Sequence, residues 1–363
     1  MIRSLGFLFL ENLCRCTLAS YNARFYSSRV LRPLSISPST NPTASALDSF
    51  LAGHRHLQTQ VIGQEHLVQR MLMTLLCGGH LLVEGAPGLA KTRAIKCLSA
   101  IIEGDFHRIQ FTPDLLPSDV TGTEIYRPED TSFVFQQGPI FHNLVLADEI
   151  NRAPAKVQSA LLEAMAEGQV SFGRQTFPLP ELFMVMATQN PIEQEGTYAL
   201  PEAQLDRFLL QVIVDYPQRQ AELDILQLVR SEAMSDTELD STNQPTLISQ
   251  KQVKEARQEM LGLHMAEPVE RYLVELVLAS RTPPADLAPY LELGASPRAT
   301  IGLDLCARAT AWLDGRTFVT PEDVQAVAHD VLRHRLIRSF EADAQGISND
   351  ALIESLLECV PVP

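Results

Sequence analysis

The chain has 363 residues, a formal net charge of −15 and 45% hydrophobic residues. This length is enough for two domains, because a single hydrophobic core stops growing at roughly 250–300 residues. No apolar run approaches the ~20 residues that a membrane-spanning helix needs, and the negative charge disfavours nucleic acid as a partner. Six scattered cysteines are typical of reduced thiols, so we expect a cytoplasmic protein.

The first 45 residues differ in composition from the rest of the chain. They contain five arginines and a single acid, Glu11, with many serines and a stretch that holds several prolines. This composition is that of an organelle transit peptide, which would place the protein in an organelle matrix. The alternative, which we favour, is a disordered tail or an upstream start codon read as coding.

Residues 81–92 read LLVEGAPGLAKT and indicate a nucleotide-binding loop. A buried strand runs into a tight turn, and Lys91-Thr92 begin a helix whose N-terminus attracts anions. Lys91 would reach the β- and γ-phosphates and Thr92 would bind Mg²⁺. Ala90 replaces the usual second glycine, which the turn tolerates if its φ is already helical. The predicted nucleotide-binding residues of this loop are Gly85, Ala86, Pro87, Gly88, Leu89, Ala90, Lys91 and Thr92.

Two later strands end in polar residues. Residues 143–147 lead to Asp148 and Glu149, and residues 182–188 lead to Asn190. Open α/β sheets bind their ligands at the carboxyl ends of the strands. We expect Asp148 to hold Mg²⁺, directly or through water, and Glu149 to activate the attacking water. Asn190 would position that water or bind the γ-phosphate.

Residues 46–217 alternate between apolar strands and helical stretches, which predicts a parallel α/β sheet with helices on both faces. The strands are expected at 80–84, 106–111, 143–147 and 182–187, and one helix at 156–167. Two inserts interrupt this pattern. Residues 121–141 contain two strand-like runs around a turn, and residues 168–178 read as a hairpin.

Residues 218–363 predict an all-α lid domain that packs beside the nucleotide. Residues 235–250 are polar and read as a linker. The next helix is expected to begin at Pro268. Ser296-Pro297 and Thr320-Pro321 indicate the starts of two further helices. In both pairs an N-cap residue precedes proline at the first helical position.

The order of phosphate loop, acidic strand and Asn-terminated strand is that of AAA+ ATPases. Residues 58–340 resemble the MoxR family of AAA+ ATPases, which is related to the ATPase subunit of magnesium chelatase. This family's own loop often carries alanine at the position of Ala90. The strings that carry the resemblance are VIGQ at 61–64, the loop at 85–92, RIQFTPDLLPSD at 108–119, DEINRA at 148–153, ATQNP at 187–191 and EAQLDRF at 202–208.

The resemblance implies roles for residues outside the phosphate loop. Val61 and Ile62 would lie near adenine. Arg207 would be the arginine finger offered to the ATP of the next subunit, the alternative being an ion pair with Asp206 or Glu202 of its own chain. Arg298 would be the nucleotide sensor of the lid, acting on its own or a neighbouring subunit. Arg152 has either an interface or a helix-capping role.

The resemblance also implies a function. We expect a Mg-dependent ATPase, a homo-hexamer, that remodels or activates a protein complex as a chaperone, including by insertion of a metal centre. Its partners would be a client protein and a protein with a von Willebrand factor A domain. Two alternatives are a small-molecule kinase with the same phosphate loop and a nucleotide-gated scaffold that does not hydrolyse ATP. The paired acids and Arg207 argue against the kinase, and Glu149 argues against the scaffold.

Overall fold

The computed structural model describes residues 45–363, apart from residues 130, 174, 192–195 and 235–245. Nearly all of the N-terminal tail expected from the sequence therefore lies outside the described residues. Within the described part, no helix is long and apolar enough to cross a membrane.

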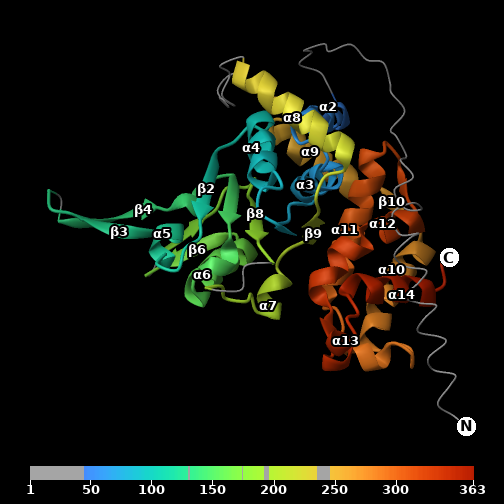
Figure 1. Ribbon diagram of the computed structural model, residues 1–363. Helices are drawn as coiled ribbons and strands as arrows, with labels where there is room; N and C mark the ends of the chain where they lie inside the picture. Colours follow the sequence, from blue (N-terminus) through green and yellow to red (C-terminus); the bar gives the residue numbers. More distant parts are fainter. Residues whose placement is uncertain (1–44, 130, 174, 192–195, 235–245) are drawn as a thin grey trace, which may run out of the picture. The chain divides into compact units, whose positions relative to one another are not determined.

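A sheet of five parallel strands carries the candidate site (Figure 1). The strand order is β2-β5-β8-β1-β9, which confirms the predicted parallel sheet. Because β8 lies between β5 and β1, the Asn-terminated strand ends between the acidic strand and the phosphate loop. The strands are β1 (Leu81–Gly85), β2 (Phe106–Gln110), β5 (Leu144–Asp148), β8 (Met184–Gln189) and β9 (Leu210–Val214).

Alternate residues of the central strands are buried on opposite faces of the sheet. In β1, Leu81 and Val83 belong to one core cluster and Leu82 to the other, since successive side chains of a strand point to opposite faces. Strands covered on both faces need continuous apolar runs, which is how these strands read. The helices of this half are α2 (Ala46–Gln60), α3 (Glu65–Cys77), α4 (Lys91–Ile101), α5 (Pro117–Thr121), η1 (Pro139–Phe141), η2 (Ile150–Arg152), α6 (Ala155–Glu167) and α7 (Glu202–Leu205).

Both predicted inserts form antiparallel hairpins. One consists of β3 (Gly122–Arg127) and β4 (Ser132–Gln137), and the other of β6 (Gln169–Phe172) and β7 (Gln175–Pro178). Phe135 of β4 stacks on Phe177 of β7 with ring centroids 4.2 Å apart. The two hairpins therefore contact each other through aromatic rings.

The second half of the described chain is mainly helical, as predicted (Figure 1). Ser296 and Thr320 are the N-cap residues of α11 and α12, with proline at the first helical position of each. The domain boundary expected between residues 217 and 218 stays a prediction. The helices are α8 (Arg219–Met234), α9 (Gln250–Leu261), α10 (Glu267–Arg281), η3 (Ala288–Tyr290), α11 (Pro297–Leu313), α12 (Pro321–Leu332), η4 (Arg333–Arg335), α13 (Phe340–Ala344) and α14 (Asn349–Cys359).

The lid differs from the sequence-based expectation in two details. Helix α9 begins where the sequence predicted only the end of a linker, much of which lies outside the described residues; its capping box joins Ser249 and Gln252. The lid also contains short strands as well as helices. Strands β10 (His264–Met265) and β12 (Phe318–Val319) pair in parallel, and β11 (Leu291–Leu293) and β13 (Ile337–Arg338) pair antiparallel.

Candidate functional site

The phosphate loop joins the end of β1 to the start of α4. Gly88 has φ +83°, and no atom lies within 4 Å of the place where a Cβ would be. A ligand can therefore approach the backbone closely at this position. The Lys91 ammonium donates to the carbonyl oxygens of Gly85 at 2.6 Å and Gln189 at 3.4 Å. Lys91 thus lies between the ends of β1 and β8.

Ala90 does not meet the condition of a helical φ under which the turn would tolerate alanine without strain. Its backbone is left-handed, with φ 56° and ψ 14°, and it is the N-cap residue of α4. Left-handed backbone costs an L-residue about 1–2 kcal/mol, because Cβ approaches the following carbonyl oxygen. Glycine adopts left-handed backbone without this cost, which is the physical reason for glycine at this position of the usual motif.

Asp148 is buried at the end of β5 and fully engaged. Its Oδ1 accepts a hydrogen bond from the Thr188 hydroxyl at 2.7 Å. Its Oδ2 accepts from the Arg108 guanidinium, at 2.7 Å from Nη2 and 3.0 Å from Nε. Charge-assisted bonds of this length are among the stronger ones in proteins, so the Asp148 carboxylate is held in place and has its charge balanced by Arg108.

Glu149 stands on strained backbone, with φ 55° and ψ 51°. Its N–H donates to the Thr188 hydroxyl at 2.9 Å. Its Oε2 accepts from Gln110 Nε2 at 2.9 Å and lies 3.0 Å from Arg152 Nε. Arg152 therefore forms an ion pair with Glu149, three residues before it. This pairing is neither the interface role nor the helix-capping role expected from the sequence. Strained residues of this kind are concentrated at functional sites.

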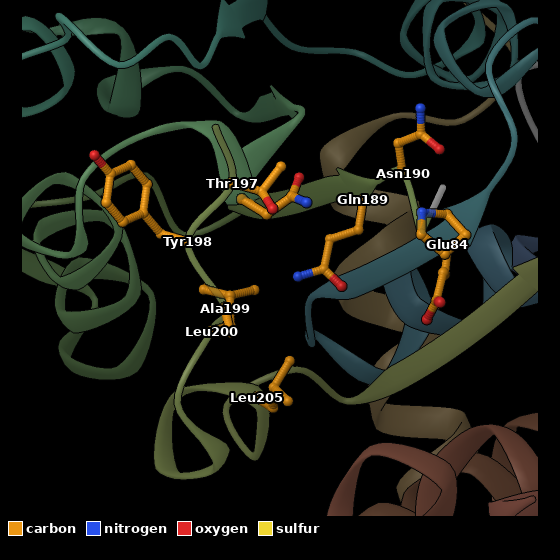
Figure 2. Close-up of a pocket in the computed structure, with 10 residues that line it drawn as sticks. Glu84, Gln189, Asn190, Thr197, Tyr198, Ala199, Leu200 and Leu205 are labelled. Atoms are coloured by element: carbon orange, nitrogen blue, oxygen red, sulfur yellow. The ribbon is translucent and has the colours of Figure 1, made fainter. Parts of the chain in front are cut away.

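Asn190 is buried directly after β8 and borders a cavity of about 320 Å³ (Figure 2). Figure 2 shows the Gln189 side chain projecting into the space between Glu84 and the segment that carries Ala199. Lys91 and Thr92 are not among the residues that line this cavity, so it adjoins the phosphate loop rather than containing it. The lining residues are Glu84, Asn151, Gln189, Asn190, Pro191, Thr197, Tyr198, Ala199, Leu200 and Leu205.

The segment expected near adenine lies beside the first turn of α4. Arg93 donates through Nε to the carbonyl oxygen of Gln60 at 2.7 Å, directly before Val61 and Ile62. Val61 is buried, with 1% of its surface exposed. On the other side, Gln64 Nε2 donates to the carbonyl oxygen of Asp215 at 3.0 Å. Contact between this segment and adenine stays a prediction.

Arg298 and Arg335 lie beside Asp206, the residue that precedes Arg207. The Arg298 side chain is 51% exposed and its Nη1 lies 3.8 Å from Asp206 Oδ2. Asp206 pairs with Arg335 at 2.9 Å. The ion pair of Arg207 with Asp206 or Glu202 that the sequence left open is not formed in the described part of the chain, where no side-chain hydrogen bond or ion pair of Arg207 is seen.

Comparison with known proteins identifies the family. The ATPase family associated with various cellular activities (AAA) matches residues 80–210, and the AAA lid domain matches residues 285–356. The chaperone MoxR1 of Mycobacterium tuberculosis is 45% identical over 308 residues, which are 84% of this chain and 79% of that protein. The chain belongs to the MoxR family of AAA+ ATPases. Protein MoxR of Paracoccus denitrificans is 33% identical over 84% of this chain and 93% of its own length.

Solved structures agree with this assignment to the MoxR family. The crystal structure of a provisionally assigned ATPase from Cytophaga hutchinsonii matches with a TM-score of 0.79 and 44% identity. The match covers 88% of this chain and 96% of that one. The parallel sheet and helical lid of this MoxR-family chain are therefore a fold already seen by crystallography.

The oxygen atoms of Thr92 and Asp148 suit Mg²⁺ chemically, since this ion prefers hydroxyl, carboxylate and water ligands. Thr92 lies in the first turn of α4 and is half-buried. Both oxygens of Asp148 already accept hydrogen bonds, from Thr188 and Arg108. This arrangement fits a contact to the metal through a coordinated water better than direct coordination by Asp148.

Three residues of this MoxR-family site have no role in the sequence-based expectations. They are Arg108, Gln110 and Thr188, which contact the two acids. A usable signal existed for two of them. Positions 108 and 110 alternate along one strand, so their side chains share a face, and Gln110 pairs in register with Asp148. Nothing in the sequence indicated which strand would lie beside β5.

Proposed function

We propose that this chain hydrolyses ATP with Mg²⁺ and uses the reaction to remodel or activate a partner protein complex. The observation that carries the proposal is the meeting of three neighbouring strand ends. Strands β5, β8 and β1 are adjacent, and Glu149, Asn190 and the phosphate loop follow them at one edge of the sheet. Such an edge is where open α/β sheets bind their ligands.

The residues suggest how the reaction proceeds. Lys91 would exchange its carbonyl partners, Gly85 and Gln189, for phosphate oxygens. Thr92 and Asp148 would hold Mg²⁺, which neutralises charge on the phosphates when bound. Glu149 would leave Gln110 and Arg152 to accept a proton from the attacking water. Catalysis of phosphoryl transfer then depends mainly on positioning and charge, as these residue types provide.

The proposed active unit is a ring of identical subunits, for which we favour a hexamer. Arg207 would reach the ATP of the next subunit. Its side chain is half-buried and makes no hydrogen bond in the described part of its own chain, so the guanidinium is available for a contact with another subunit. Arg298 would act as the lid's nucleotide sensor. The Mycobacterium tuberculosis relative is named chaperone MoxR1, and this name supports the chaperone part of the proposal. A client protein, a von Willebrand factor A partner and insertion of a metal centre are further parts of this proposal.

Two substitutions separate binding from hydrolysis. Lys91→Ala should abolish ATP binding in calorimetric titration, because the described loop loses its cation next to Gly85. Glu149→Gln should bind ATP with unchanged affinity but turn it over on the order of 10²–10⁴-fold more slowly, as expected for loss of a general base. Unchanged ATP affinity in the first variant, or unchanged turnover in the second, would contradict the assignment of the site.

Mixed rings test whether the site is shared between subunits. Arg207→Ala subunits keep Glu149, and Glu149→Gln subunits keep Arg207. Each variant alone should be inactive, and a mixture should recover turnover wherever an intact Arg207 faces an intact Glu149. An inactive mixture would mean that both residues serve the same subunit. Turnover proportional to protein concentration down to the monomer range would favour the kinase alternative instead.

A further inference from the structure

The segment that holds Arg207 is fixed by the lid on both sides of that residue. This segment, Asp206–Leu209, connects α7 to β9. On one side of Arg207 is the Asp206 carboxylate, and on the other are the carbonyl oxygens of Phe208 and Leu209. All three accept hydrogen bonds from the lid residue Arg335. The position of this segment is therefore restrained by the lid as well as by the sheet.

Arg335 is a buried guanidinium with most of its hydrogen-bonding capacity used on this segment. Its side chain is 3% exposed. It donates to Asp206 Oδ1 at 2.9 Å, to the Phe208 carbonyl oxygen at 2.6 Å and to the Leu209 carbonyl oxygen at 3.1 Å. A buried charge that loses its partner is strongly unfavourable. Arg335 and Asp206 are therefore expected to move together or not at all.

A second lid residue reinforces the same contact. His334 Nε2 lies 2.9 Å from the Phe208 carbonyl oxygen, so the ring must donate from Nε2. Burial, aided by the adjacent Arg335, lowers the pKa of His334 well below its usual range. The ring is therefore neutral near pH 7 and adds a hydrogen bond without adding a second buried charge.

Asp206 also contacts the start of α11, a separate lid element. The Ser296 hydroxyl, the N-cap of α11, donates to Asp206 Oδ2 at 2.8 Å. The backbone N–H of Arg298 donates to that same hydroxyl at 3.1 Å. Asp206 thus connects α11, whose first turn contains Arg298, to Arg207, its own neighbour in the chain.

We propose that Asp206 and Arg335 are positioning residues that make Arg207 follow the lid of its own subunit. This inference rests on the proposed role of Arg207 as a finger in the neighbouring site. A lid movement caused by nucleotide in one subunit is passed through Asp206 and Arg335 to the Arg207 that this subunit offers to the next. Neither residue belongs to the phosphate loop or lines the cavity beside it.

Substitution of Asp206 tests the proposal. Asp206→Asn keeps the size of the side chain and an acceptor for Ser296 but removes the charge that faces Arg335 at 2.9 Å and Arg298 at 3.8 Å. We expect turnover to fall at least tenfold and the ATP dissociation constant to change less than twofold. Asp206→Asn added to Arg207→Ala should cause no further loss, since both would act through one group. A multiplied loss in the double variant would overturn the proposal.

Mixing gives a readout that a merely structural defect would not produce. Asp206→Asn subunits have an intact phosphate loop and Glu149, so a mixture with Glu149→Gln subunits should recover turnover. If turnover recovers when Arg207→Ala is mixed with Glu149→Gln but not when Asp206→Asn is, the role of Arg207 as a finger is supported and the role of Asp206 is overturned. If neither recovers, the shared site itself is wrong.

A matched control and a milder variant separate positioning from stability. Asp323 is a buried carboxylate of the lid, and it pairs with Arg316 at 2.7 Å, away from Asp206–Leu209. Asp323→Asn should lower the unfolding midpoint and leave turnover within twofold. If Asp206→Asn does not fold, Ser296→Gly removes one bond to Asp206 at little capping cost and should lower turnover severalfold; unchanged turnover would overturn the proposal.

Discussion

The hydrogen bond between Gln110 and Glu149 predicts that Gln110→Ala raises basal turnover. Glu149 Oε2 is held by Gln110 Nε2 at 2.9 Å and by Arg152 Nε at 3.0 Å. A carboxylate held in this way has fewer lone pairs available for a proton from water. In the proposed reaction Glu149 must leave these partners before it can act, and removal of one partner makes that step easier.

The size of the effect follows from the strength of this bond. Hydrogen bonds to charged groups contribute roughly 1.5–3 kcal/mol. The Glu149 side chain is 30% exposed, so water replaces part of the lost bond and we take ~1 kcal/mol as the net change. That energy corresponds to about a fivefold rise in the population of free Glu149, and therefore in turnover at saturating ATP.

The assay is steady-state release of phosphate at saturating Mg·ATP, with ATP affinity measured separately. Gln211→Ala is the matched control, because Gln211 also donates to a glutamate on the neighbouring strand, Glu84, at 2.7 Å. The control should stay within twofold of the parent chain. A fall in turnover for Gln110→Ala would refute the reasoning, since it would mean that Gln110 holds Glu149 in its productive position.

Two further predictions concern stability. Ala90→Gly should stabilise the nucleotide-free chain by ~0.5–1 kcal/mol, since relief of left-handed strain exceeds the added unfolded-state entropy; urea unfolding measures this, and Ala94→Gly within α4 should do the opposite. Buried His80, which accepts from the Val185 N–H at 3.1 Å, has its pKa lowered by burial to about 4. Below about pH 6.5 the unfolded chain takes up a proton at His80 that the native ring does not bind, so His80 alone should lower the free energy of unfolding by ~1.4 kcal/mol per pH unit, up to about 3 kcal/mol near pH 4. His80→Gln should remove this part of the slope and leave the part that buried His334 contributes; an equal slope in the variant would contradict this account.

The sequence by itself determined the features that depend on neighbouring residues. The continuous apolar run at 81–83 predicted β1, because a strand covered on both faces needs apolar side chains in succession. The hairpins β3–β4 and β6–β7 followed from short strand-like runs around turns. The starts of α11 and α12 followed from an N-cap residue and proline, whose effects act within one helical turn.

The sequence did not determine a helix whose apolar pattern is weak, or a backbone conformation that is unusual for its residue type. Helix α9 buries only Val253, Ala256 and Met260 among its twelve residues, so its apolar periodicity was too sparse to predict a helix; the capping box at Ser249 was the available signal. The left-handed φ of Ala90 could not be predicted because alanine seldom adopts it.

Only the tertiary structure decided which side chains surround the candidate chemical groups. Arg108 and Gln110 reach Asp148 and Glu149 because β2 lies beside β5. Arg108 and Asp148 are 40 residues apart in the sequence. Asp206 meets Arg335 across 129 residues of sequence. Neither contact leaves a local pattern, because the energy of each comes from burial and charge pairing that exist only after the sheet and lid have packed.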